Sequence, residues 1–141
     1  MKNFIIIVLL LILIAPALGA HERDYQEHAN KTRFHGITEH VLDDGTRVDI
    51  LVKGQYVIEV DFAKKWYEAI GQASHYSYKT KIPPAIYLIV RTDEDLEKVE
   101  RAKRVCERLF IVIDNKLYRY TVFFIDDRDG KESSHFGNQD E

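Results

Sequence analysis

Residues 37–62 constrain the fold most, because apolar and polar side chains alternate there in three short segments separated by turns. The segments are residues 37–41, 47–52 and 56–62. A period of two places successive side chains on opposite faces of a sheet, so each segment is predicted to be a strand. The pair Asp44-Gly45 favours a tight hairpin after the first strand, and Gly54-Gln55 provides the second turn. The region is therefore predicted to be an antiparallel three-stranded meander.

The second half of the chain alternates between helical and strand patterns. Residues 63–78 carry apolar side chains at helical spacing, and residues 85–90 form a continuous apolar run typical of a strand buried on both faces. Thr92, followed by three acidic residues, predicts the start of another helix. Further strands are predicted at 110–113 and 117–125, and a weak helix at 21–33. This order predicts an α/β fold, a three-layer-type sandwich with a mixed β-sheet flanked by helices.

The first twenty residues form a separate segment. Lys2 precedes an unbroken apolar run from Phe4 to Ile14, and small residues follow up to Ala20. This is the pattern of a secretory signal peptide, and the run is shorter than the roughly 20 apolar residues of a membrane span. We expect residues 1–20 to be cleaved, which leaves an exported, periplasmic or secreted protein with no stable membrane span. An uncleaved anchor is the alternative.

Charge divides the rest of the chain into a neutral domain and an acidic tail. Residues 21–125 contain 17 basic and 17 acidic side chains, and residues 126–141 contain 2 basic and 6 acidic ones. The tail has too few apolar side chains to offset the entropy of ordering, so it is predicted to be disordered. A neutral domain does not by itself favour nucleic-acid binding. Cys106 is the only cysteine, so core packing alone must stabilise the predicted domain.

Three carboxylates mark the candidate site. Asp49 lies in the second predicted strand, and Glu59 and Asp61 share one face of the third. If these strands pair, the three carboxylates gather on the face opposite Ile58 and Val60. Carboxylates held together repel one another, and a hard divalent cation such as Mg²⁺ relieves that repulsion.

Basic and polar side chains follow the carboxylates. Lys64 and Lys65 come directly after the third strand, and Gln72 and Tyr76 lie one turn apart on the next helix. Each residue also has a purely structural interpretation. The lysines would lie at the solvated start of a helix, Tyr76 would pack in the core, and Asp61 would pair with Arg47 across the hairpin.

These residues together resemble the PD-(D/E)XK nuclease superfamily. The resemblance consists of Asp49, the triplet Glu59-Val60-Asp61 and the helical stretch Gln72-Ala73-Ser74-His75-Tyr76. The Gln-x-x-x-Tyr element is similar to that of the RecB-like exonuclease branch, and residues 44–72 also look like a set of small uncharacterised bacterial proteins. The resemblance covers about residues 36–92 and implies a restriction-endonuclease-like fold for the domain at 21–125.

The resemblance implies a metal site and a reaction. Asp49 and Glu59 would bind Mg²⁺ or Mn²⁺ with help from the Val60 carbonyl, and Glu39 would match an upstream acid that completes the metal shell. The cation would generate hydroxide from water and stabilise the phosphorane-like transition state, leaving a 5′-phosphate and a 3′-hydroxyl.

The sequence departs from the family pattern at Asp61, where a lysine is expected. Asp61 would then be a further metal ligand or the base for the attacking water. Alternatively, Lys64 or Lys65 would return its ammonium to the site from the helix. Gln72 and Tyr76 would position the DNA backbone or orient that lysine.

Two functions follow from the resemblance. The first is a Mg²⁺-dependent nuclease, a phosphodiesterase acting outside the cytoplasm on nucleic acid, with DNA the expected substrate. A neutral domain of this size would need a homodimer or a partner to hold a duplex. The second is a catalytically inactive member of the same fold, exported as a binding or interaction module. The carboxylate cluster together with Gln72 and Tyr76 favours the first. The acid at position 61, the neutral charge and the small size favour the second.

Overall fold

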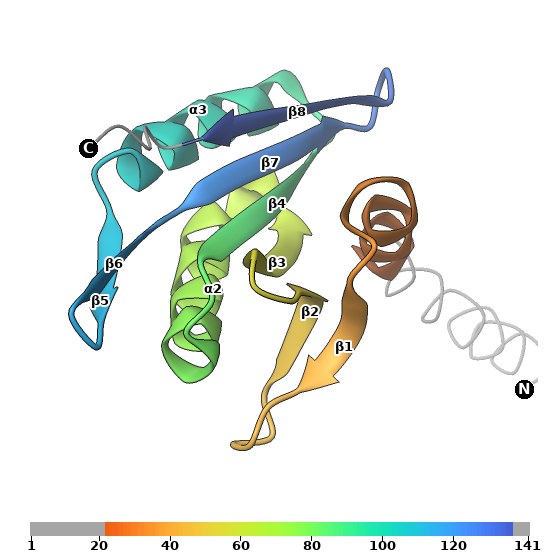
Figure 1. The fold of residues 1–141 in the computed structure, drawn as a ribbon. Coiled ribbons are helices and arrows are strands. Elements are labelled where there is room, and N and C mark those ends of the chain that lie inside the picture. The colour runs from red at the N-terminus through yellow and green to blue at the C-terminus, as the bar shows by residue number, and fades with distance from the viewer. Residues whose placement is uncertain (1–21, 137–141) are drawn as a thin grey trace, which may run out of the picture.

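The computed structural model describes residues 22–136, and the predicted signal segment lies outside this range. Six strands form one mixed sheet in the order β1-β2-β3-β4-β7-β8, and β5 and β6 form a separate two-stranded sheet (Figure 1). Among the described residues, no helix is both long and apolar enough to cross a membrane.

The chain begins with a helix that ends close to the sheet. Residues 22–29 are α-helical and continue into the π-helical turn η1 (Asn30–Phe34), which confirms the predicted helix. His35 ends it with a φ of 51°. A Cβ built on Gly36 would lie 2.4 Å from the Leu51 carbonyl oxygen, so only glycine allows the chain to pass this close to the sheet.

The predicted meander is confirmed. β1 (Ile37–Val41), β2 (Arg47–Val52) and β3 (Tyr56–Phe62) pair antiparallel in sequence order. Gly45 and Gly54 take positive φ angles of 82° and 73° in the two turns, a conformation that favours glycine.

The crossover after β3 is helical, as predicted. A 3₁₀ turn, η2 (Ala63–Lys65), leads into α2 (Trp66–Thr80), and β4 (Pro84–Val90) then runs parallel to β3. Every residue of β4 is buried, as its unbroken apolar run predicts. α3 (Asp93–Cys106) starts with a capping box in which Thr92 accepts a hydrogen bond from the Asp95 backbone N–H.

The predicted single strand at 117–125 is wrong, because the chain divides there into two strands. Asp114 and Asn115 both have positive φ angles, and their turn pairs β5 (Phe110–Ile113) with β6 (Lys116–Arg119) away from the main sheet. At Tyr120, whose hydroxyl hydrogen-bonds the Ser74 hydroxyl, the chain turns into β7 (Thr121–Asp126), parallel to β4.

The predicted disorder of 126–141 is also wrong for residues up to 136. The turn at 127–130, in which Gly130 has a φ of 68°, returns the chain as β8 (Lys131–Phe136), antiparallel to β7. Backbone hydrogen bonds to β7 order a polar segment that has little to bury, a tertiary effect that composition does not show. Residues 137–141 lie outside the described range.

Two apolar cores lie on opposite faces of the sheet. α2 and α3 pack on one face, where Ala73, Val99 and Cys106 contact β4 and β7. The N-terminal helix packs on the other face through Tyr25 and Ala29. The predicted α/β sandwich with a mixed sheet between helical layers is therefore confirmed, and Cys106 is buried within it.

Candidate functional site

The candidate site lies where β2 separates from β3. Their ladder runs from Val52 and Tyr56 to Ile50 and Ile58, and it stops before Asp49 and Glu59, the next pair in register. Beyond that point the Asp49 Oδ2 accepts a hydrogen bond from the Val60 backbone N–H at 2.7 Å. A side-chain carboxylate thus replaces a backbone carbonyl between the strands and is held beside Glu59.

Glu59 is buried without a full set of hydrogen-bond donors. Its side chain is 6% exposed, and its Oε2 has no hydrogen-bond partner among the described residues. Burial raises the pKa of Glu59, and the neighbouring Asp49 carboxylate raises it further. Burial also raises the pKa of Asp49, although the Val60 N–H opposes that shift. Both carboxyl groups are therefore harder to ionise than in water, and the negative charge of one disfavours ionisation of the other.

Glu39 lies opposite Asp49 in β1 with an unusual backbone. Its φ is 54°, and the ladder pairs Thr38 with Ile50 and His40 with Val48 but leaves out Glu39 and Asp49. In place of a ladder hydrogen bond, the Gln26 side-chain amide donates to the Asp49 carbonyl at 2.8 Å and to Glu39 Oε1 at 2.9 Å. A non-glycine residue in the left-handed region within a strand stores strain, as functional sites often do.

Arg47 also contacts Glu39, with an Nη1 to Oε2 distance of 3.1 Å. The arginine that would have explained Asp61 structurally is thus paired with a different acid. Asp61 is 3% exposed and accepts a hydrogen bond from the Phe62 backbone N–H at 2.7 Å. Its Oδ1 lies 3.7 Å from the Lys65 ammonium, and burial raises its pKa.

The two candidate lysines are placed differently. Lys65 reaches back to Asp61, whereas Lys64 is exposed and lines a small hollow with Phe62 and Arg91. Of the two alternatives, Lys65 is the lysine that the structure brings to the carboxylates.

Gln72 and Tyr76 meet on α2, above Glu59. Tyr76 is 5% exposed, and its hydroxyl donates to Gln72 Oε1 at 3.2 Å. Burial raises the pKa of Tyr76, and the Glu59 carboxylate adds to that shift. Gln72 itself is exposed, so the pair connects the buried carboxylate with the surface.

Sequence reasoning missed two residues of this cluster, both on the N-terminal helix. Burial and the charges of Asp61 and Asp49 raise the pKa of Glu22, which places this acid beside the cluster. Gln26, one turn later, is 4% exposed and makes the two bonds described above. Their spacing of four residues puts them on one helix face with Ala29, a signal that was present in the sequence.

The donor set suits a hard cation only in part. Within residues 22–136, no three or more His, Cys, Asp or Glu side chains are arranged as a ready metal-binding group. Glu39 is held by Gln26 and Arg47, which leaves Asp49 and Glu59 as the central pair. The unpartnered Glu59 oxygen beside the half-buried Asp49 carboxylate is the feature that fits a cation, because Mg²⁺ and Mn²⁺ prefer carboxylate oxygens.

Comparison of the chain with protein-family models, curated proteins and solved structures finds no match. The chemistry of the site is therefore interpreted from its own side chains and from the order of its strands.

Proposed function

We propose that this protein is a divalent-metal-dependent nuclease that hydrolyses nucleic-acid phosphodiester bonds outside the cytoplasm. The observation that carries the proposal is the pairing of half-buried Asp49 with buried Glu59 where β2 separates from β3. Among the described residues, one Glu59 oxygen has no hydrogen-bond partner. Two like charges are costly in such a place unless a cation or a proton compensates them.

The order of elements supports a restriction-endonuclease-like fold of the PD-(D/E)XK type. A helix precedes three antiparallel strands, and a second helix leads to a strand parallel to the third. The acids lie on the second and third strands, and Gln72 and Tyr76 lie on the crossover helix.

Asp49 and Glu59 would hold Mg²⁺ or Mn²⁺, with Glu39 released from Arg47 as a third acid. The bound cation would supply an activated water and a positive charge for the phosphoryl oxygens. Burial of the site excludes bulk water, which strengthens each of these interactions.

The remaining side chains would orient the substrate and the nucleophile. Lys65 supplies the ammonium that the family carries at the position of Asp61, and Asp61 holds that ammonium at the site. The Tyr76 hydroxyl orients Glu59, and Gln72 offers an exposed amide to the nucleic-acid backbone.

A specific observation favours a second function. Lys65 is paired with Asp61, and the family lysine is replaced by that same acid, so the cluster would bind a ligand without catalysing hydrolysis. In that case the chain is an inactive member of the fold, exported as a binding or interaction module.

Digestion of linear and single-stranded DNA with Mg²⁺ or Mn²⁺ separates these functions. If the protein is a nuclease, the wild type cleaves the DNA, and the Asp49→Ala and Glu59→Ala variants do not. Cleavage that survives both substitutions would place the activity elsewhere. Absence of cleavage, together with absence of Mg²⁺ binding, would leave the binding module.

A further inference from the structure

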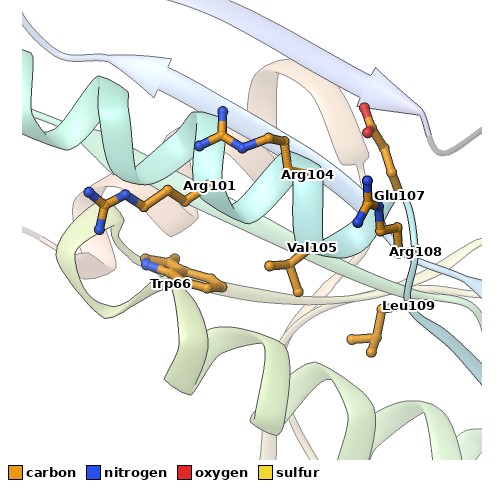
Figure 2. A pocket seen from close by; sticks show the side chains of 7 residues that line it. All are labelled: Trp66, Arg101, Arg104, Val105, Glu107, Arg108 and Leu109. Atoms are coloured by element: carbon orange, nitrogen blue, oxygen red, sulfur yellow. The ribbon is translucent and has the colours of Figure 1, made fainter.

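An open hollow of about 670 Å³ lies between α3 and the start of α2 (Figure 2). Arginine side chains extend from α3 and the turn after it, and the Trp66 ring lies beneath that helix. The lining residues are Trp66, Arg101, Arg104, Val105, Glu107, Arg108 and Leu109. The hollow thus combines three positive charges and one negative charge with an aromatic face.

Arg101 and Arg104 lie on α3, and Arg108 lies in the turn after it. Arg101, Arg104 and Arg108 follow at intervals of three and four residues, and none forms an ion pair within the described part of the chain. By contrast, Lys98 and Lys103 of the same helix pair with Glu94 and Glu100.

The hollow begins one residue from the carboxylate site. Trp66 follows Lys65, whose ammonium lies 3.7 Å from Asp61. Trp66 also meets Tyr67 edge to face, with ring centroids 5.9 Å apart, and Tyr67 is 60% exposed. Aromatic faces beside a basic stripe are the usual means of holding an unstacked nucleic-acid strand.

We propose that this hollow binds a single-stranded segment of the nucleic-acid substrate and directs it toward the carboxylates. Arg101, Arg104 and Arg108 contact successive phosphates, and a base stacks on the Trp66 indole. This proposal rests on the nuclease function proposed above, and it names the substrate form as single-stranded. A nucleic-acid strand fits arginines beside an indole better than an acidic peptide does, because its bases can stack on the ring while its phosphates contact the arginines.

Trp66 fluorescence tests the stacking directly, because the chain contains one tryptophan. A short oligothymidylate is added to the full chain in EDTA, so that binding is measured without cleavage. Stacking predicts saturable quenching of the fluorescence. Binding seen by anisotropy of a labelled oligonucleotide without quenching would overturn the proposal, and so would absence of binding.

A pair of matched variants tests the arginines. Arg101→Ala/Arg104→Ala removes two exposed charges from the hollow, and Lys31→Ala/Lys53→Ala removes two exposed charges elsewhere. The first variant is expected to bind about tenfold more weakly, with the slope of log K against log salt reduced by about 1.4. The control is expected to keep the wild-type slope. Equal slopes in both variants would overturn the proposal, and so would equally good competition by an oligoglutamate peptide.

The two proposals fail separately. Arginine-dependent quenching in a chain that never cleaves DNA would support nucleic-acid binding by the hollow and contradict the nuclease function. The opposite result is metal-dependent cleavage that Asp49→Asn abolishes, together with oligonucleotide binding that Arg101→Ala/Arg104→Ala does not change. It would support the nuclease function and contradict nucleic-acid binding by the hollow.

Discussion

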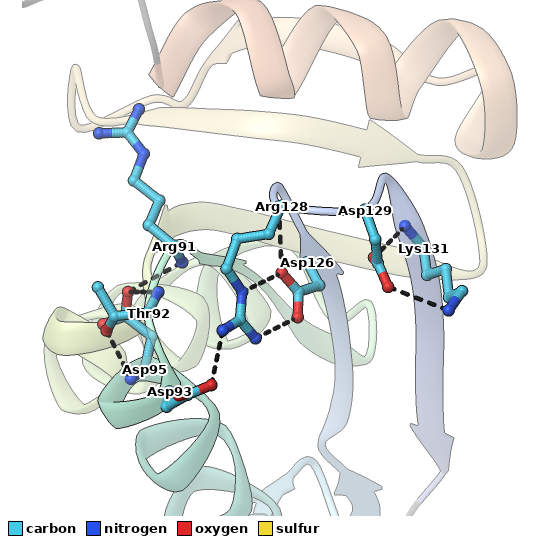
Figure 3. Close-up of polar contacts among 8 residues, drawn as sticks. All are labelled: Arg91, Thr92, Asp93, Asp95, Asp126, Arg128, Asp129 and Lys131. Carbon is cyan, nitrogen blue, oxygen red and sulfur yellow. Dashed lines mark hydrogen bonds and ion pairs between the residues drawn. The ribbon is translucent and has the colours of Figure 1, made fainter.

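Two clusters of acidic residues in this molecule differ in what surrounds them. In the cluster between α3 and the β7–β8 turn, every acid drawn in Figure 3 has a donor. Asp126 accepts hydrogen bonds from the Arg128 Nε and Nη2 at 2.9 and 2.7 Å, and Asp93 accepts one from Nη1 at 2.6 Å. These bonds hold the pKa of Asp126 below its usual range, and bonds from Lys131 do the same for Asp129.

The cluster between β2 and β3 shows the opposite pattern. Burial raises the pKa of Asp49, Glu59 and Asp61, and an oxygen of Glu59 has no partner among the described residues. Asp49 and Asp61 also accept backbone hydrogen bonds, so the two clusters differ in the burial of their acids and in the Glu59 oxygen that lacks a donor. This difference separates the structural carboxylates from the candidate functional ones.

The largest effect is expected on activity. Asp49→Asn and Glu59→Gln should each reduce metal-dependent cleavage at least about 10²-fold, because each removes a charge that holds the cation. The measurement is the release of acid-soluble nucleotides. Asp126→Asn is the matched control and should keep the wild-type rate. A large loss in the control would remove the distinction between the clusters.

The two lysines give the next largest effect. Lys65→Met should slow cleavage about tenfold or more, because the Lys65 ammonium is the one held at the carboxylates. Lys64→Met should leave the rate within about twofold, since Lys64 points into a separate hollow. Initial rates at saturating Mg²⁺ decide between them, and the reverse order would assign the role to Lys64.

Stability should respond to Glu59→Gln in the direction opposite to most core substitutions. Because the folded-state pKa of Glu59 is raised, the folded protein binds more protons than the unfolded chain above about pH 4, and wild-type stability falls as the pH rises through the folded pKa. Glutamine removes this dependence and should add about 1–3 kcal/mol at pH 8 in metal-free buffer. Urea denaturation at several pH values measures it.

Asp126→Asn, the matched variant in the cluster between α3 and the β7–β8 turn, should change stability in the opposite direction. Asp126 has a lowered pKa, so its contribution to stability is present above the unfolded-state pKa and is lost as the pH falls through the folded one. Asp126→Asn should therefore lower stability at neutral pH, by a small amount because its partner Arg128 is exposed and the ion pair is open to solvent on that side. Stabilisation by Asp126→Asn, or destabilisation by Glu59→Gln at pH 8, would contradict the electrostatic account.

Gln26→Ala should change stability less than Glu59→Gln does. It removes two hydrogen bonds to the Asp49 carbonyl and Glu39, which should cost about 1–2 kcal/mol. Gln55→Ala, in the exposed turn between β2 and β3, is the control and should leave the unfolding midpoint unchanged. If both variants unfold alike, Gln26 does not support the strand backbone.

Local patterns predicted most of the fold, and tertiary contacts account for the errors. Alternation placed β1 to β3, and the apolar run placed β4, because in these segments burial alone decides the conformation. The break at Tyr120 depends on the Ser74 hydroxyl in α2, and β8 depends on the backbone of β7. Neither dependence is visible in the residues that are affected.

For the site too, local patterns predicted some residues, and tertiary contacts account for those that were missed. Asp49, Glu59 and Asp61 were predicted because they lie on strands whose faces can be read from the sequence. Glu22 and Gln26 were missed because the N-terminal helix reaches the site only through the packing of Tyr25 and Ala29 against the sheet. The choice between Lys64 and Lys65 depends on the 3₁₀ turn at Ala63–Lys65, which helical spacing does not predict.

The nuclease proposal requires that Asp49 and Glu59 together bind a divalent cation. Calorimetric titration of the full chain with Mn²⁺ at pH 7 tests it most directly. The wild type is expected to bind Mn²⁺ saturably, Glu59→Gln is expected to lose that binding, and Asp126→Asn is expected to keep it. Wild-type protein that binds no Mn²⁺, or Glu59→Gln protein that binds it equally well, would contradict the account.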